Sequence, residues 1–352
     1  KNKRMSHNHT YIIGEIGQNH NGSVDIAKLI IDAAARPVHD SLFDLELPRM
    51  DAVKLTKRDL AQELSASQMS REYNSPHSFG KTYGEHREKL ELNDEQHFEL
   101  YQYAKSHGLD FVETLCAVGC LSMTKYFMPD RLKVASRDLT NLPLLSALAE
   151  TQIPIILSTG MGGYKEIEDA LSTISRYHEN ISILHCVSEY PTRPENANLL
   201  SIKALQKKYP NYTIGYSDHT VGISAPVSAV AMGASIIEKH ITLDRRMKGT
   251  DQAGSLGVDG IQRMVRDIRL IERSMGTEDV FIAESTVSAK HKLERSIATK
   301  REILAGEVIQ ESDLHLLSPG DGFKWHELTQ VAGKVANQNI PADEIIYPQH
   351  IS

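Results

Sequence analysis

The chain lacks an excess of basic residues. Its 39 Lys and Arg stand against 46 Asp and Glu, which gives a formal net charge of -7, and the basic residues are spread along the sequence. A nucleic-acid surface needs a basic patch or stripe. The composition therefore argues against a nucleic-acid partner and favours an acidic, soluble enzyme, while local basic pockets for small anions remain open.

Long apolar runs and cysteines are also scarce. No stretch approaches the roughly 20 apolar residues of a membrane span, and the first ten residues, KNKRMSHNHT, have no apolar core of a signal peptide. We therefore expect no membrane association and a cytoplasmic location. Cys116, Cys120 and Cys186 are odd in number and lack a usual zinc or redox spacing, so we expect them to be small core residues.

What the chain does contain is a regular alternation of apolar strands and amphipathic helices. Its 352 residues, 40% of them hydrophobic, suit two domains or one barrel with an appendage. Polar residues collect at the carboxyl ends of the strands, as in an α/β fold of the (β/α)8 or TIM-barrel type. A doubly wound sheet is the alternative. The predicted strands are residues 11–16, 52–55, 111–114, 132–136, 154–157, 181–187, 213–216 and 235–237.

The segments between and after the strands set the expected domain boundaries. We interpret residues 36–49 as a loop and residues 56–93 as a long polar loop of the lid or binding type, followed by a helix that Asp94 caps. The barrel is expected to span residues 1–276 and a linker residues 277–292. Residues 293–352, with frequent Gly, Pro and Asp turns, predict a small β-rich domain.

Two histidines follow neighbouring strands. His219 comes after the strand at 213–216, and His240 after the strand at 235–237. In a parallel barrel both would face the same mouth. Two imidazoles, with Asp218 and Glu238 beside them as supporting hydrogen-bond partners, suit one divalent metal. Two histidines that are only hydrogen-bonded in loops are the alternative interpretation.

Cationic and hydroxyl side chains lie at other strand ends. If they converge, they form a pocket for a small, multiply charged anion such as a phosphorylated acid; a solvated loop charge is the alternative for any single lysine. Glu15 and Asp251 are candidates to orient sugar hydroxyls or to move a proton, or else are ordinary salt-bridge partners. The pocket candidates are Lys54, Thr114, Lys133, Ser136 and Ser217.

Five stretches of the chain resemble the sialic acid synthase family: EIGQNHNG, ILSTGM, LHCVSEYPT, IGYSDHT and IEKHITLD. The C-terminal region resembles that family's SAF, or antifreeze-like, domain. The resemblance implies an enzyme that condenses phosphoenolpyruvate with an N-acylated hexose aldehyde, such as N-acetylmannosamine, to a 3-deoxy-2-ulosonic acid and phosphate. It also implies a divalent metal, Mn2+ first with Mg2+ or Co2+ as alternatives, and a domain-swapped homodimer in which one subunit's SAF domain covers the other's barrel mouth.

The resemblance also assigns roles to individual residues. His219 and His240 match the metal ligands, and Glu15, Tyr190 and Asp251 match contacts to the acceptor sugar. The residues that match the phosphoenolpyruvate pocket are Lys54, Thr114, Lys133, Ser136, Ser188, Tyr190 and Ser217.

Three positions depart from the family pattern. Thr56 stands where the family usually has Gln, Arg137-Asp138 where it has Gly-Glu, and Ser318 where it has Arg before Pro-Gly. These departures lie on the acceptor side. One alternative is therefore a 3-deoxy-ulosonate synthase for a different aldose, phosphorylated or non-acylated, with Arg137 binding the extra anion. Another is a catalytically silent barrel that binds a sugar acid or a partner protein.

Overall fold

A computed structural model describes residues 9–352 of the chain. Within this range the chain divides into two compact units, residues 9–276 and 277–352, which are described separately below. We expected no signal peptide in residues 1–10. Of these, the structure describes only His9 and Thr10. Among residues 9–352, no helix is both long enough and apolar enough to cross a membrane.

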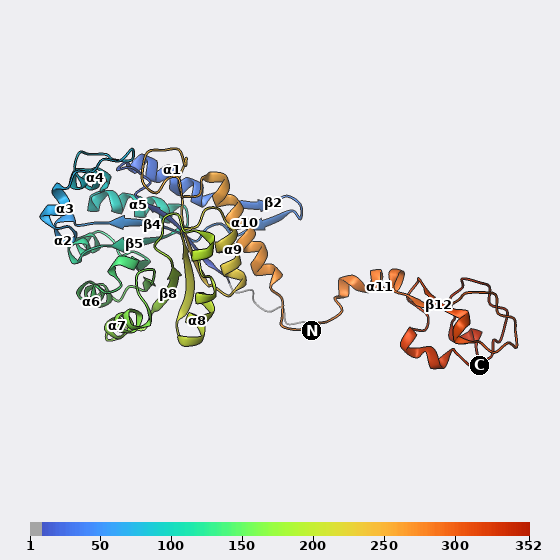
Figure 1. Cartoon of the computed structure of the whole chain (residues 1–352). Coiled ribbons are helices and arrows are strands. Elements are labelled where there is room, and N and C mark those ends of the chain that lie inside the picture. The colour runs from blue at the N-terminus through green and yellow to red at the C-terminus, as the bar shows by residue number, and fades with distance from the viewer. Residues whose placement is uncertain (1–8) are drawn as a thin grey trace. The chain divides into compact units, whose positions relative to one another are not determined.

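The first unit is a closed barrel of parallel strands surrounded by helices (Figure 1). Around the ring the strands follow the order β1, β10, β9, β8, β7, β6, β5 and β4, and the ring closes between β4 and β1. This confirms the predicted TIM barrel and excludes a doubly wound sheet. The strands are β1 (Tyr11–Gly17), β4 (Ala52–Lys57), β5 (Asp110–Leu115), β6 (Arg131–Val134), β7 (Ile155–Ser158), β8 (Ile181–Cys186), β9 (Thr213–Asp218) and β10 (Ile236–His240).

Amphipathic helices cover the outside of the barrel. In α10 the buried residues Ile261, Met264, Val265 and Ile268 recur at helical spacing and face the strands, as expected for a helix with one apolar stripe. The helices of this unit are α1 (Val24–Ala35), α2 (Leu60–Glu63), α3 (Ala66–Ser70), α4 (Tyr83–Leu90), α5 (Asp94–Ser106), α6 (Leu142–Glu150), α7 (Tyr164–Ile174), α8 (Leu200–Lys208), α9 (Ser224–Ala231) and α10 (Val258–Ser274).

The barrel interior changes from apolar to polar along the strands. Six buried apolar residues on six strands form one cluster inside the barrel: Ile13, Ala52, Val112, Ile156, Leu184 and Ile236. Side chains two positions apart on a strand point to the same face, so the next interior layer comes two residues later in each strand. That layer consists of Glu15, Lys54, Thr114, Ser158, Cys186 and Glu238, all of them buried. The barrel interior therefore has an apolar layer, and a buried polar layer lies next to it on the side of the carboxyl ends of the strands.

Several local predictions were wrong. Residues 36–49 are not only loop, because β2 (Val38–Asp40) and β3 (Leu45–Leu47) pair as a short antiparallel hairpin. The segment from 56 to 93 contains α2, α3 and α4, short helices whose polar sequences bury little and so carry a weak apolar pattern. The cap of α5 is Asn93 rather than Asp94; its side chain accepts a hydrogen bond from the Gln96 backbone N–H.

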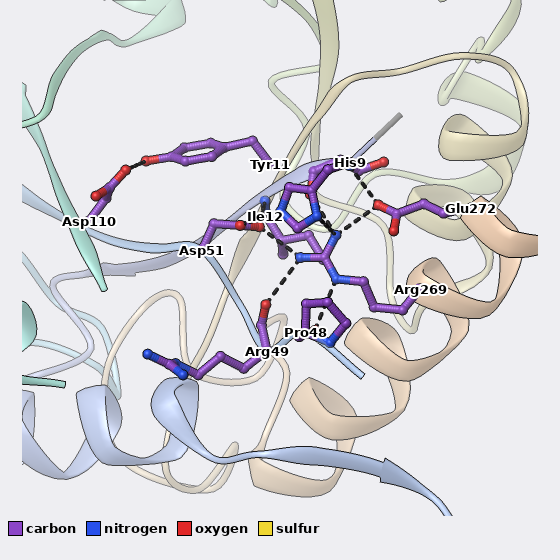
Figure 2. Close-up of polar contacts among 10 residues, drawn as sticks. His9, Tyr11, Ile12, Pro48, Arg49, Asp51, Asp110, Arg269 and Glu272 are labelled. Carbon is purple, nitrogen blue, oxygen red and sulfur yellow. Dashed lines mark hydrogen bonds and ion pairs between the residues drawn. The ribbon is translucent and has the colours of Figure 1, made fainter. Parts of the chain in front are cut away.

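One buried guanidinium group binds several residues at the amino-terminal end of the barrel strands. Arg269 on α10 donates to the backbone carbonyls of Thr10, Pro48 and Arg49 and to the carboxylates of Asp51 and Glu272 (Figure 2). All five of its N–H groups therefore have partners although the side chain is 1% exposed. The last helix of this unit, α10, is thereby tied to the residues that immediately precede β1 and β4.

The second unit is small and β-rich. β11 (Ser296–Thr299) and β12 (Leu314–Leu317) pair antiparallel, and isolated bridges join the remaining segments. The stretch expected as a plain linker contains α11 (Val287–Leu293). A compact apolar cluster forms the core of this unit: Ile297, Ile303, Ile309, Leu314, Val331, Ala336, Ile340 and Ile346.

Candidate active site

A cavity of about 310 Å3 opens at the carboxyl ends of the barrel strands. In a TIM barrel this face carries the active site. The candidate catalytic, substrate-binding and metal-binding residues of the first unit all line the cavity: Glu15, Lys54, Thr56, Thr114, Lys133, Ser136, Arg137, Ser188, Tyr190, Ser217, His219, His240 and Asp251. The structure therefore brings together side chains from strands far apart in the sequence.

The floor of the cavity is a chain of buried charges. Lys54 Nζ lies 2.5 Å from a Glu15 carboxylate oxygen and 3.8 Å from Glu238 Oε2, and it donates to Thr114 Oγ1 at 2.8 Å. Lys133 Nζ lies 3.2 Å from Glu238 Oε1, which also accepts from Ser217 Oγ at 2.9 Å. The positive charges of the two lysines are therefore matched by the negative charges of the two glutamates.

These contacts hold the floor in its ionised form. Burial alone would raise the pKa of Glu238, but the charges of Lys133 and Lys54 and the Ser217 hydrogen bond outweigh it and hold that pKa well below its ordinary value. Burial alone would lower the pKa of Lys54, yet the carboxylates of Glu15 and Glu238 raise it. At neutral pH Glu238 is consequently a carboxylate and Lys54 an ammonium group.

The two histidines stand side by side at the mouth. Their ring centroids are 5.7 Å apart, and the Tyr190 ring lies 4.0 Å from that of His219. His219 Nδ1 lies 2.8 Å from the Val187 carbonyl oxygen, which fixes the ring and leaves Nε2 for a ligand. His240 Nδ1 is buried without a hydrogen-bond partner. Both imidazoles therefore keep a nitrogen available.

The supporting carboxylates predicted for these histidines have other partners. Asp218 accepts from Lys239 Nζ at 2.5 Å, from Tyr216 Oη at 2.8 Å and from the Thr220 backbone N–H at 2.9 Å. Glu238 belongs to the floor. The expectation that Asp218 and Glu238 hold the imidazoles was wrong. Asp218 is engaged by Lys239, Tyr216 and Thr220, on the side of β9 opposite to Ser217. Glu238 faces the cavity but is engaged by Lys133 and Ser217.

The donor set is compatible with a divalent ion that completes its coordination with water or substrate. Among residues 9–352, no group of three or more His, Cys, Asp or Glu is placed to hold a metal, so the protein would supply two imidazoles. The unpartnered buried nitrogen of His240 fits a ligand role. Two imidazoles would leave coordination positions of such an ion open to water or substrate, as in a catalytic rather than a structural site.

Three arginines line the cavity near the ends of β4 and β6. Arg58 and Arg137 each contact Glu63 Oε1, at 3.0 and 3.2 Å, and Arg87 donates to the side chains of Gln18 and Tyr83. Arg137 was predicted from its departure from the family pattern. Arg58 and Arg87 were missed because they lie in the segment interpreted as a polar loop.

Other residues of the cavity also escaped prediction. Gln18, Ser158, Met161, Cys186, Glu238 and Thr250 line it as well. A cavity position for Glu238 could have been predicted, because it precedes His240 by two residues in the same strand and therefore faces the same side. The three cysteines are buried and free, as predicted, although Cys186 reaches the cavity wall.

Ser318 lies in the second unit. Its hydroxyl donates to the Leu293 carbonyl oxygen at 2.8 Å. The nearby Lys324 ammonium contacts Glu294 at 2.9 Å. Within its own unit the Ser318 side chain is therefore already engaged.

A family model described as the NeuB family matches residues 48–280, and a model for the SAF domain matches residues 294–352. The chain belongs to the NeuB family. The match confirms the predicted enzyme class, a phosphoenolpyruvate-dependent sugar-acid synthase with a C-terminal SAF domain. Synthases of the NeuB family are generally metal-dependent.

Relatives of this NeuB chain carry synthase names. It is 33% identical over 347 residues to the N-acetylneuraminate-9-phosphate synthase of Mus musculus, covering 97% of this chain and 92% of that protein. It is 32% identical over 348 residues to the N,N'-diacetyllegionaminic acid synthase of Legionella pneumophila, with coverage of 97% and 94%. The solved N-acetylneuraminic acid synthetase of Leptospira borgpetersenii, in complex with citrate, is 31% identical with a TM-score of 0.66, covering 82% and 94%.

Proposed function

We propose that the chain condenses phosphoenolpyruvate with an N-acylated hexosamine aldehyde to form a nine-carbon 3-deoxy-2-ulosonic acid. The observation that carries the proposal is the cavity itself, in which paired lysines, hydroxyls and two available imidazoles converge. In the balanced reaction, C3 of phosphoenolpyruvate forms a bond to the aldehyde carbon. One water adds at C2, the C2–O bond to the phosphate breaks, and inorganic phosphate leaves.

The lysines and hydroxyls of the floor would hold phosphoenolpyruvate. Lys54 and Lys133 offer charge-assisted hydrogen bonds to its phosphate and carboxylate, and Thr114, Ser136, Ser188 and Ser217 offer hydroxyl donors around them. Positioning the two reactants together supplies much of the rate enhancement in such condensations.

The remaining charged and aromatic groups would act on the acceptor. Glu15, Tyr190 and Asp251 are assigned to its hydroxyls, and the two carboxylates are the candidates to move protons to and from the oxygen atoms. Glu15 Oε2 is buried and makes no hydrogen bond besides its ion pair with Lys54, so it has capacity to accept one from a substrate.

His219 and His240 would hold the divalent ion, Mn2+ as the first expectation. When bound, it would act as a Lewis acid toward the acceptor's carbonyl oxygen. The contact of His219 Nδ1 with the Val187 carbonyl oxygen would orient that ring.

We also propose a homodimer in which the SAF domain of one subunit covers the barrel mouth of the other. The small core of that domain supports this proposal, because about 60 residues bury too little surface for ample stability alone. The apolar residues Val280, Phe281 and Ile282 that precede it are exposed within the chain and would be covered in such an assembly.

The test is release of inorganic phosphate from phosphoenolpyruvate across a panel of aldoses with and without N-acyl groups. We expect release that depends on an N-acylated hexosamine and on divalent metal. Release with a non-acylated aldose alone would identify the different-aldose alternative. No release with any aldose would favour the silent barrel. A Lys54→Met or Lys133→Met variant should raise the KM for phosphoenolpyruvate about ten-fold or more.

A further inference from the structure

Asp251 lies on a loop that no regular element supports. Residues 241–257 follow β10 and precede α10, and they contain no helix or strand. Thr250 and Asp251 line the cavity from this loop. A carboxylate that acts on a substrate must be held in one place, because a displacement of about 1 Å can lower a rate about a hundred-fold. The contacts that fix residues 248–251 therefore bear on the reaction.

The part of the loop that follows Asp251 is fixed by buried hydrogen bonds. The Asp251 carbonyl oxygen accepts from Ser255 Oγ at 2.6 Å, and that hydroxyl oxygen accepts from Asn19 Nδ2 at 2.9 Å. The side chain of Gln252, which is fully buried, donates to the Asn19 carbonyl oxygen at 3.1 Å. These contacts anchor the backbone after Asp251, whereas the residues before it need a separate support.

Residues 248 and 249 receive that support from segments far away in the sequence. Asn21 Nδ2 donates to the Lys248 carbonyl oxygen at 2.9 Å. The Lys248 ammonium group lies 4.7 Å from the centre of the Phe79 ring, within the range of a cation–π contact. The Gly249 backbone N–H donates to His77 Nδ1 at 3.3 Å. Two of the three contacts therefore come from the segment between α3 and α4.

The loop that carries His77 and Phe79 is itself held in shape. Glu72 and Thr82 form an antiparallel bridge, which closes this 72–82 loop at its base. The Phe79 backbone N–H donates to Nδ1 of His86 on α4 at 3.1 Å, and the two rings stack with their centroids 5.9 Å apart. His86 is 1% exposed, so it is a fixed part of the protein interior. The 72–82 loop therefore offers His77 and Phe79 from a defined position.

We propose that His77 and Phe79 are positioning residues of the enzyme. Through residues 248 and 249 they fix the loop that presents Asp251 to the cavity. This inference rests on the proposed function in one respect, the assignment of Asp251 to the acceptor sugar. Neither His77 nor Phe79 is among the residues that line the cavity, so both act on the reaction only through the loop. Their loss should consequently impair use of the sugar and spare the binding of phosphoenolpyruvate by the lysines of the floor.

The first experiment measures the kinetics of His77→Ala and His77→Asn with N-acetylmannosamine and phosphoenolpyruvate. His77→Ala leaves the Gly249 N–H without its partner, whereas the amide oxygen of an asparagine can accept in place of Nδ1. We expect kcat/KM for the sugar to fall about ten-fold in His77→Ala and at most about two-fold in His77→Asn, with the KM for phosphoenolpyruvate unchanged in both. Equal rises in KM for the two substrates, or an equal loss in both variants, would overturn the proposal.

A double-mutant cycle tests the contact between Phe79 and Lys248. Phe79→Leu removes the ring face and Lys248→Met removes the charge, so each should lower kcat/KM for the sugar about three-fold. The double variant should lose no more than either single variant, because both changes remove one contact. Phe43→Leu is the matched control, since Phe43 is 67% exposed between β2 and β3, and it should be neutral. Losses that multiply in the double variant would overturn the route through Lys248.

Amide hydrogen exchange of the full-length protein separates this inference from the proposed function, because it needs no substrate. Peptides that span residues 244–251 should exchange about ten-fold faster in the double variant His77→Ala with Phe79→Leu than in the unaltered protein or in Phe43→Leu. Such a rise supports the inference even if no aldose is a substrate. Unchanged exchange would overturn it even if phosphate is released as proposed. Faster exchange with an unchanged kcat/KM for the sugar would also overturn it, because the loop would then be ordered without consequence for the reaction.

Discussion

At the scale of single residues, the main feature of the site is that its charges are paired before a substrate arrives. Glu238 bridges Lys133 and Lys54, and Glu15 pairs with Lys54. An anion that binds the lysines must therefore share them with carboxylates already present. This arrangement keeps two ammonium groups buried without a ligand, which would otherwise be unfavourable.

Replacing Glu238 by Gln should destabilise the ligand-free protein by roughly 3 to 5 kcal/mol, because Lys133 would lose its carboxylate partner while remaining buried. Phosphoenolpyruvate should recover part of this loss by supplying a new anion. Thermal or urea unfolding with and without phosphoenolpyruvate measures both effects. Glu168→Gln, which removes a surface partner of Lys208, is the control and should change stability by less than about 1 kcal/mol.

The same variant makes a prediction about pH. The folded-state pKa of Glu238 is held below its ordinary value, so its ionised form adds stability above that ordinary value and loses this contribution as the pH falls through the folded-state pKa. The stability difference between the unaltered protein and Glu238→Gln should accordingly be full at pH 7 and shrink below about pH 4. A difference that grows on acidification would contradict the assigned ion pairs.

Replacing His219 or His240 by Ala should abolish turnover and weaken Mn2+ binding, since each is expected to supply one of only two protein ligands. Chelation should abolish activity reversibly. Phosphate release and the electron paramagnetic resonance signal of free Mn2+ report the two effects. His326→Ala, an exposed histidine of the SAF domain, should be neutral, and full activity in the presence of chelator would disprove the metal assignment.

At the scale of elements, β9 and β10 are joined behind the cavity wall by a buried ion pair. Lys239 Nζ contacts Asp218 Oδ2 and donates to the Thr220 carbonyl oxygen. Asp218 and Lys239 each adjoin a cavity histidine in the sequence. The pair therefore sets the separation of the two strand ends from which His219 and His240 project.

Lys239→Met should lower Mn2+ affinity about ten-fold or more, an effect typical of losing a group that orients a metal ligand, and should destabilise the fold by roughly 3 kcal/mol because Asp218 stays buried and charged. The double variant Asp218→Asn with Lys239→Met should lose less stability than the single change. Mn2+ titration and thermal unfolding separate the two effects. Unchanged Mn2+ affinity would assign the pair to stability alone.

Much of the barrel was predictable from its strands because their interior positions follow a simple alternation. Ile13 and Glu15, or Ala52 and Lys54, show the step from the apolar layer to the polar layer within one strand. The hairpin at residues 38–47 and the helices at residues 60–90 were not predictable in this way. They bury few side chains, so their sequences carry little periodicity.

The limits of prediction within the site have a similar cause. His219, His240 and Lys54 lie at strand ends, where their orientation follows from the fold. Arg58 lies beyond β4 and Arg87 on α4, so only the packing of that segment brings them to the cavity. Asp218 was misassigned because proximity in sequence to His219 did not mean proximity on the same face.

At the scale of the whole molecule, the SAF domain is expected to be needed for activity rather than for folding of the barrel. A chain ending at Lys292 should unfold cooperatively, because the barrel has its own core and closes without the second unit. It should be monomeric and lose phosphate release. Light scattering and the release assay test this. A truncated barrel that remains fully active as a monomer would show that the domain is incidental to catalysis.

Closure of the barrel has a consequence for the order of folding during synthesis. Arg269 satisfies the backbone carbonyls of Thr10, Pro48 and Arg49 from a helix more than 200 residues further along the chain (Figure 2). Until that helix leaves the ribosome, these groups and Asp51 lack their partner, and β10 has not yet joined β1. A nascent chain arrested before residue 236 should therefore stay protease-sensitive at its first strand, and protection there should appear only after α10 has emerged.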